Sequence, residues 1–291
     1  MLKKFTLLAA FILLTTLQVK AQESIVVSDT LVGWDQGWVT GLNGAQAAYS
    51  NWSQGGVNNI SFSGNSTYRA YYREKRFSYG FLINTRYGLT RFDGEGTRKT
   101  DDRFSIRNRF LYDIGAEESD FSLYANLNFR TQFDQGFDYG AGPDGGDRLI
   151  SNFLAPAYIS QNAGLSYSPG DHFTFETGIG LRQTIVRETE LAPLYGLDEG
   201  DSFRNEAGFN LGASYEQSIA TNMVMSSSIE TFTNINRALS STNVFFSTEV
   251  LGRINNLMNA SVRLDLVYDD NFSNQLQVRQ SLSLGISFIL I

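Results

Sequence analysis

Charged side chains recur at every second position in several stretches of this 291-residue chain, which puts them on one face of a β-strand. The basic residues precede most of the acidic ones along the chain. The basic set is Arg69, Arg86, Arg103, Arg107, Arg109 and Arg130, and the acidic set is Glu206, Glu216, Glu230 and Glu249. Facing each other across a water-filled passage, such charges would set up a transverse field and select polar solutes.

Enzymatic chemistry finds little support among the residue types present. The chain has one histidine, His172, in the short turn Ser168-Pro169-Gly170-Asp171-His172. A serine hydrolase needs an imidazole within hydrogen-bond reach of its nucleophile, and a short turn cannot readily join a site built from other strands. We expect His172 to be a solvated turn residue, and we predict no catalytic residue, no enzymatic activity and no cofactor.

Acidic residues gather in two predicted external loops. Asp198, Glu199 and Asp201 share one loop, and Asp269 and Asp270 share the other. Their oxygens could bind Ca²⁺ or Mg²⁺, or bridge lipopolysaccharide phosphates through such ions. A solvated acidic loop is the simpler interpretation, and we predict no metal site. The segment 144–147 lacks the ligand spacing of a calcium loop, and a chain without cysteine has no thiol chemistry, disulfides or Cys-based metal sites.

The elements that must position these charges are strands, because apolar and polar residues alternate with a period of two. In Phe104–Ile114, for example, Phe104, Ile106 and Phe110 oppose Arg107 and Arg109. The predicted strands are Trp38–Tyr49, Ile60–Tyr72, Phe77–Leu89, Phe104–Ile114, Phe121–Phe133, Phe153–Tyr167, Phe173–Ile185, Ala207–Tyr215, Met223–Thr233, Val244–Ile254, Met258–Tyr268 and Leu276–Leu290. Met223–Thr233 is the weakest of the later ones, since Val224 and Phe232 break its alternation.

The predicted fold class is therefore all-β, a transmembrane antiparallel up-and-down barrel of about twelve strands. Mean hydropathy of −0.20 excludes a helical membrane protein. Long connections (134–152 and 188–203) lie on one side, and short ones (73–76, 115–120, 168–172, 217–220 and 255–257) lie on the other. This segregation is typical of bacterial barrels with long external loops and tight periplasmic turns. Aromatic residues near the strand ends favour such a barrel over the alternative, a soluble β-sandwich.

The N-terminus has the features of an export signal. Lys3 and Lys4 precede a short apolar run, 5–17, and Val19-Lys20-Ala21 is compatible with signal peptidase cleavage. We expect a signal peptide at 1–21, a periplasmic N-terminal segment at 22–37 and an outer-membrane barrel at 38–291. The expected location is the outer membrane of a Gram-negative bacterium. The expected partners are outer-membrane lipid and lipopolysaccharide, the barrel-assembly machinery during insertion and small solutes. The net charge of −7 argues against nucleic acid.

Four segments in order carry a family resemblance. They are Asn51-Trp52-Ser53-Gln54-Gly55-Gly56, Thr131-Gln132-Phe133 with Gly136, Ser151-Asn152-Phe153-Leu154-Ala155-Pro156-Ala157-Tyr158, and Tyr268-Asp269-Asp270-Asn271. Together they resemble a family of uncharacterised outer-membrane proteins of Bacteroidota, catalogued as a domain of unknown function. The resemblance spans the chain from about Trp38 to its end. It implies a barrel and an outer-membrane address, and it transfers no functional residue.

Three functional hypotheses follow. The first is a passive channel or uptake pore for small polar solutes, with the inward charges as its selectivity surface. The lumen charge candidates are Arg86, Arg107, Arg109, Arg130, Glu206, Glu230 and Glu249. The second is a structural or binding barrel that contacts lipopolysaccharide or envelope partners through its external loops. A lipid-modifying enzyme ranks last. A twelve-stranded barrel lies between the filled and the open sizes, so salt bridges that fill the interior remain an equal alternative to a passage.

Overall fold

The computed structural model of the chain describes residues 25–48, 57–115, 119–142, 145–170, 172–237, 239, 242–269, 271 and 273–290. The expected signal peptide at 1–21 and the motif at 51–56 lie outside the described residues. So do the single positions Asp144, Asp171 and Asp270.

Twelve strands form one closed antiparallel barrel, in the order β1-β14-β13-β12-β11-β10-β9-β8-β5-β4-β3-β2. The barrel strands are β1 (Gly33–Ala47), β2 (Asn59–Glu74), β3 (Phe77–Phe92), β4 (Gly96–Asp113), β5 (Phe121–Thr131), β8 (Ala157–Tyr167), β9 (Phe173–Ile185), β10 (Phe203–Ala220), β11 (Met223–Asn234), β12 (Asn243–Arg253), β13 (Met258–Asp269) and β14 (Ser273–Ile289). Each has at least 11 residues, enough for a tilted strand to cross a bilayer. The predicted fold class is confirmed.

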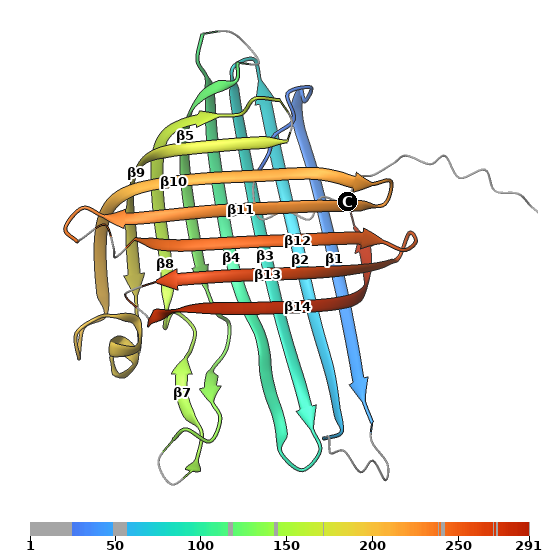
Figure 1. Ribbon diagram of the computed structural model, residues 1–291, viewed down its shortest axis with the longest axis vertical. Helices are drawn as coiled ribbons and strands as arrows, with labels where there is room; N and C mark the ends of the chain where they lie inside the picture. The colour runs from blue at the N-terminus through green and yellow to red at the C-terminus, as the bar shows by residue number, and fades with distance from the viewer. Residues whose placement is uncertain are drawn as a thin grey trace, which may run out of the picture.

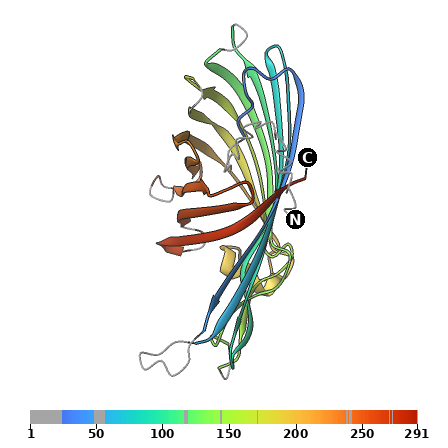
Figure 2. The same ribbon diagram turned by 90° about the vertical axis from the view of Figure 1, so that its right-hand side faces the viewer.

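The early strands β1–β4 cross the late strands β10–β14 (Figure 1), as opposite walls of a barrel with tilted strands do. Figure 2 shows the same crossing from the side, with the late strands β12–β14 extending away from the wall formed by the early strands. The short connections Lys75–Arg76, 114–120, 168–172, 221–222 and 254–257 all lie at one end of the barrel, here named the turn end. The opposite end, here named the loop end, carries the two longest connections, β5 to β8 and β9 to β10.

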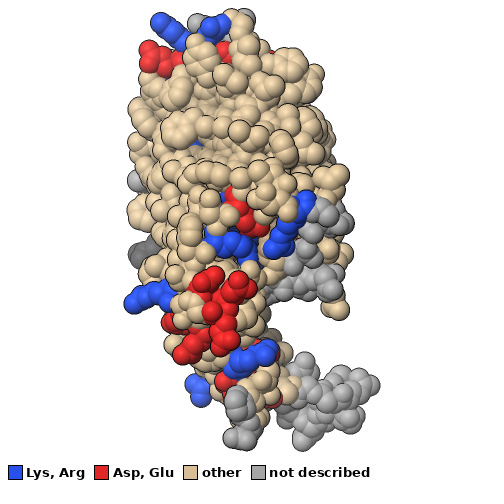
Figure 3. All heavy atoms as spheres, turned by 90° about the vertical axis from the view of Figure 1, so that its left-hand side faces the viewer, with Lys and Arg blue, Asp and Glu red and all other residues tan. Residues whose placement is uncertain are grey.

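The outer surface of the barrel is apolar, as the alternation predicts. Exposed outward side chains include Phe62, Phe110, Leu123, Leu165, Ile179, Phe209, Val262 and Leu282. On the face in Figure 3, charged groups lie at the top and over the lower half of the molecule, and the band between them is nearly free of charge. Because an exterior of this kind is stable only against lipid, the chain is an outer-membrane β-barrel.

Aromatic residues surround the turn end. Trp34 packs on Tyr72 with ring centroids 5.0 Å apart, and Phe121 stacks on Tyr167 at 4.6 Å. Phe77 lies beside Tyr112 in the register of β3 and β4. These rings form a girdle at the depth where amphipathic aromatic groups meet the lipid headgroups.

The long connections at the loop end have structure of their own. The strands β6 (Gly136–Asp138) and β7 (Arg148–Ser151) pair within the β5–β8 connection, and the 3-10 helix η2 (Thr189–Tyr195) lies in the β9–β10 connection. A small apolar cluster of Ala155, Val186, Leu191, Ala192, Tyr195 and Leu197 joins the two connections. Among the described residues, no helix has the length and apolar character needed to span a membrane.

The barrel is closed by β1 and β14, and this junction is short. Its register runs over five residue pairs, from Val39 with Ile289 to Asn43 with Gly285. By contrast, β1 pairs with β2 along its whole length, from Gly33 with Arg73 to Ala47 with Asn59. The first strand also begins at Gly33, earlier than the expected Trp38.

Candidate functional site

The barrel encloses a cavity of about 1120 Å³, to which all twelve barrel strands contribute lining residues. Most of the inward side chains are polar, among them Asn65, Asn84, Ser105, Asn128, Ser160, Ser247, Ser261 and Ser283. A second, much smaller cavity of about 80 Å³ lies toward the turn end. The large cavity therefore occupies much of the lumen, and the small one lies beside it toward the turn end.

The structure brings most of the predicted lumen charges to these cavities. Arg86, Arg107, Arg130, Glu230 and Glu249 line the large one, and Arg107, Arg109 and Glu230 line the small one.

Glu206 is set apart from the other candidates, toward the loop end, where its residue is only 4% exposed. Arg204 Nε lies 3.2 Å from its Oε2, and Asn234 Nδ2 donates to its Oε1 at 3.0 Å. These contacts enclose the carboxylate, so Glu206 acts there as a structural anchor.

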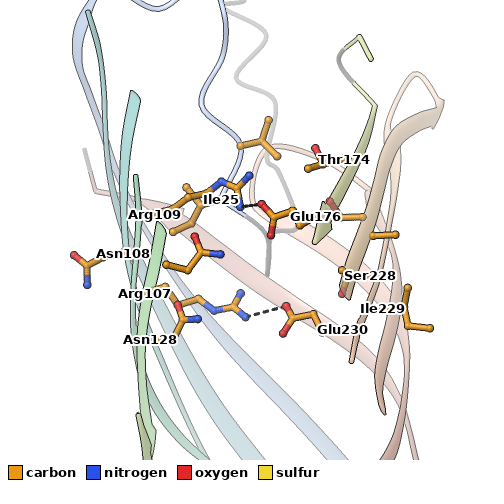
Figure 4. Close-up of a pocket in the computed structure, with 15 residues that line it drawn as sticks. Ile25, Arg107, Asn108, Arg109, Asn128, Thr174, Glu176, Ser228, Ile229 and Glu230 are labelled. Atoms are coloured by element: carbon orange, nitrogen blue, oxygen red, sulfur yellow. Dashed lines mark ion pairs between the residues drawn. The ribbon is translucent and has the colours of Figure 1, made fainter. Parts of the chain in front are cut away.

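Two ion pairs cross the lumen at the turn end. Arg107 on β4 faces Glu230 on β11, with Nη2 3.8 Å from Oε1, and Arg109 on β4 pairs with Glu176 on β9 (Figure 4). Asn108, between the two arginines in sequence, points away from the lumen in the same view. The expected opposition of early basic and later acidic charges is therefore present here, and it takes the form of direct bridges.

Elsewhere the separation into a basic and an acidic wall is incomplete. The late strands also supply Arg182, Arg263 and Arg279, and the early strand β4 supplies Asp101. Arg279 Nη1 lies 3.9 Å from Asp101 Oδ1 across the lumen. These four residues were not among the candidates, although each occupies the inward parity of its strand, which is the signal that identifies them.

The loop end of the lumen is bounded by a third bridge, between Arg182 on β9 and Asp269 on β13. The ring of Tyr158 lies beneath two guanidinium groups, with Arg130 Cζ at 4.8 Å and Arg182 Cζ at 5.7 Å from its centroid. Such cation–π contacts stabilise arginines that have lost part of their hydration.

The Arg182–Asp269 bridge lies where segments far apart in sequence come together. Thr131 Oγ1 donates to the Pro156 carbonyl at 3.0 Å and accepts from the Leu154 amide at 3.1 Å. Asp269, through Arg182, reaches the same region. Three of the four segments that carry the family resemblance therefore meet at the loop end.

Nearby, the Tyr87 hydroxyl donates to Asp134 at 2.8 Å and lowers the pKa of that loop carboxyl. The carboxylate therefore remains ionised in mildly acidic solution, and its bond to Tyr87 holds the start of the β5–β8 connection.

At the turn end, the N-terminal segment enters the lumen. Ile25 and Val27 are buried against Tyr71 and Leu82, and Ile25 also lines the small cavity beside Arg109. This position of Ile25 against Tyr71 and Leu82 is here named its seat. The seat depends on Gly80, because a Cβ built on that residue would lie 2.0 Å from Ile25 Cγ2. The segment 22–37 was expected to be periplasmic, and the structure places its described start inside the barrel and Gly33 onward in β1.

A buried charge network anchors this segment. Arg73, only 5% exposed, lies 2.9 Å from Asp113 and donates to Ser78 Oγ at 2.9 Å. The same guanidinium lies 2.9 Å from Asp29 of the segment. The contacts that hold the segment therefore include the packing of Ile25, Val27 and Leu31 and the Asp29–Arg73 ion pair.

The structure places His172 in the exposed turn between β8 and β9, where its Nδ1 lies 2.9 Å from the Glu216 carbonyl. In the described parts of the chain, no three His, Asp or Glu side chains lie together as a metal site would require. Asp198, Glu199 and Asp201 stand exposed in the β9–β10 connection.

Comparison of the sequence with known families gives one match. Residues 45–137, about a third of the chain, match a family described as "Protein of unknown function (DUF3078)". The sequence has no significant match among curated proteins. Over these residues the match agrees with the expected resemblance to a domain of unknown function, while its extension to the end of the chain and the origin in Bacteroidota stay predictions.

Similar solved structures are outer-membrane barrels. An outer membrane channel from Pseudomonas putida F1 has a TM-score of 0.42 at 10% identity, with 89% of this chain and 95% of that one covered. The translocator domain of the autotransporter NalP from Neisseria meningitidis has a TM-score of 0.39 at 14% identity, with 87% and 86% covered. The NanC porin has a TM-score of 0.37 at 10% identity, with 87% and 98% covered. Similarities this distant do not identify a solute or a partner for this chain.

Proposed function

We propose that the chain is an outer-membrane channel for small polar solutes, and that Arg86, Arg107, Arg109, Arg130, Glu230 and Glu249 form its selectivity surface. The observation that carries the proposal is the cavity of about 1120 Å³, lined by polar and charged side chains from every wall of the barrel. A barrel that served only as a scaffold would gain stability by filling this space with apolar side chains.

The turn end controls passage in this proposal. Arg107, Glu230, Arg109, Glu176 and Ile25 line a cavity of about 80 Å³ there, and the two bridges cross the lumen at this level. Solute therefore crosses the whole lumen only when the N-terminal segment leaves its seat. In this proposal the departure of the segment breaks the packing of Ile25 and Val27 and the Asp29–Arg73 ion pair.

The experiment is a conductance measurement on refolded protein in planar bilayers, with the wild type beside a variant that expels the segment, Gly80→Ala. We expect rare conductance steps from the wild type and frequent ones from the variant. Liposome swelling with glucose outside reports solute flux independently. A folded Gly80→Ala variant that neither conducts nor admits glucose would overturn the channel proposal.

The loop end favours a second candidate, a binding barrel. The β6–β7 hairpin and η2 are packed together through Leu149, Leu191 and Tyr195, although connections that only join strands need no such core. Acidic groups gather on the face of the molecule drawn in Figure 3. In this proposal the loop end contacts lipopolysaccharide through divalent cations or contacts an envelope protein. Replacing 134–152 by a short turn would abolish that contact, and an unchanged envelope phenotype would remove the candidate.

The barrel contacts lipid through its apolar exterior. We propose that the barrel-assembly machinery inserts it into the membrane. A catalytic role has no supporting observation, since His172 lies in a turn and is bonded to backbone.

A further inference from the structure

Arginines from several walls of the barrel line the large cavity. Arg86 on β3, Arg103 on β4, Arg263 on β13 and Arg279 on β14 all line it, and the last three are close enough to Arg86 to act on its charge. Like charges that share a partly desolvated space repel one another, and the arrangement is stabilised when anionic groups lie among them.

The carboxylates in this region are already shared between guanidinium groups. Asp101 lies 3.4 Å from Arg86 and 3.9 Å from Arg279. Asp265 lies 2.9 Å from Arg263 and 2.9 Å from Arg279. Asp101 and Asp265 are thus each shared between two guanidinium groups, and Glu249 Oε2 lies a further 3.8 Å from Arg263 Nη1.

Arg86 is the least satisfied of these side chains. Its Nε and Nη2 are buried and have no hydrogen-bond partner within the described part of the chain, and the approach of Nε to Asp101 does not have hydrogen-bond geometry. A buried donor without a hydrogen bond costs about 1–3 kcal/mol of folding free energy, and a charged donor costs more. Arg279, whose side chain is 48% exposed, lets a ligand reach the same space from the cavity.

We propose that Arg86, Arg103, Arg263 and Arg279 form a binding site for the carboxylate of a small hydroxylated organic anion. A guanidinium fork matches a carboxylate in a planar, bidentate manner. The hydroxyl and amide side chains of Ser105, Asn84 and Ser283 line the same cavity and can bond the hydroxyl groups of the ligand. The inference rests on the proposed function, because solute must be able to enter the lumen.

The test is calorimetric titration of the refolded full chain in detergent with gluconate. Glucose serves as the matched probe of nearly equal size without the charge. We expect saturable heat from gluconate and none from glucose. Added NaCl should weaken gluconate binding because it screens the guanidinium groups. No saturable binding of gluconate to folded wild type would overturn the inference.

Three variants identify the site. Arg86→Gln removes the charge and should weaken gluconate binding by about tenfold or more, as expected for a lost charge-assisted bond. Asp101→Asn releases Arg86 and Arg279 from a competing carboxylate and should strengthen binding several-fold, an outcome that misfolding cannot produce. Arg69→Gln is the matched control, since Arg69 pairs with Asp35 at 2.8 Å outside the site. Equal affinities in wild type, Arg86→Gln and Asp101→Asn would place any gluconate elsewhere.

The binding and transport results separate the two proposals. Gluconate bound by a barrel that never conducts would refute the channel and keep the site. A conducting barrel in which Arg86→Gln leaves gluconate affinity unchanged would keep the channel and refute the site.

Discussion

The seat of the N-terminal segment can be emptied or locked by changing one or two residues. A Cβ on Gly80 would lie 2.0 Å from Ile25 Cγ2, so Gly80→Ala and a seated Ile25 cannot coexist. The same Cβ would lie 3.5 Å from Ile25 Cβ, which is within the range found in disulfides. The double variant Ile25→Cys/Gly80→Cys should therefore form a bond that holds the segment in the lumen.

The expected size of the effect follows from burial. Ile25 is 7% exposed in its seat, and burying an isoleucine side chain contributes about 1.5–3 kcal/mol. A loss of about 2 kcal/mol changes the ratio of seated to released segment by about thirtyfold. We expect Gly80→Ala to increase the time that the channel spends conducting by a factor of that order.

The assay is single-channel recording before and after addition of a reductant. The chain has no cysteine of its own, so the engineered pair is the only disulfide that can form within it. We expect the oxidised double variant to conduct less than the wild type, and reduction to restore conductance. Mass spectrometry establishes that the bond is present in the recorded sample.

Two controls separate the seat from general effects of substitution. Gly212 lines the same small cavity, but a Cβ there would meet nothing closer than 3.8 Å, so Gly212→Ala should conduct as the wild type does. Ile25→Cys alone should not respond to reductant in the same way. The reasoning is refuted if a verified disulfide leaves conductance unchanged, or if Gly80→Ala and Gly212→Ala behave alike.

Three further outcomes are expected. Arg107→Ala/Arg109→Ala removes the arginines of both turn-end bridges and leaves their carboxylates. Conductance should therefore rise, and the reversal potential in a KCl gradient should move toward K⁺ selectivity. An unchanged reversal potential would contradict a role of these arginines in selectivity. Ile179→Arg places a charge on the lipid face and should cost about 2–4 kcal/mol of folding free energy in urea titrations in vesicles, whereas lumen-facing Ser281→Arg should cost clearly less. Tyr195→Phe removes a 2.6 Å bond to a β7 carbonyl and should speed protease cleavage of the β9–β10 connection. Burial raises the pKa of the Tyr195 hydroxyl, so its contribution is fully present below the ordinary value of about 10 and is lost as the pH rises through the raised one; cleavage that already speeds up in mild acid would contradict this.

Strand parity was readable from the sequence wherever one face meets lipid and the other meets water. Outside the bilayer that contrast disappears. The outer part of β4, from Gly96 to Asp102, is polar on both faces and was missed for that reason. Phe232 broke the alternation of β11 because it points inward, close to the position that a Cβ on Gly208 would occupy. The absence of a side chain at Gly208 leaves the space that the inward ring of Phe232 occupies.

The site was predictable as a set of inward charges and unpredictable as a set of pairs. Alternation placed Arg107 and Glu230 on inward faces, and the structure places them there. Which residues meet across the lumen depends on the tilt and stagger with which the sheet closes, and local sequence patterns do not encode these. The entry of Ile25 into the barrel also left no periodic signal, because the segment is too short to show one.

The wall of this cylinder is joined over a much shorter length at β1 and β14 than at β1 and β2. Each missing residue pair removes interstrand hydrogen bonds. The pairing of β1 with β14 is therefore the shortest between neighbouring strands of the barrel. Thermal or mechanical stress should therefore part the sheet along this line first, and backbone amides of β1 and β14 should exchange with deuterium before those of β3 and β4. A molecule leaving the lumen sideways into the bilayer would find its lowest barrier there.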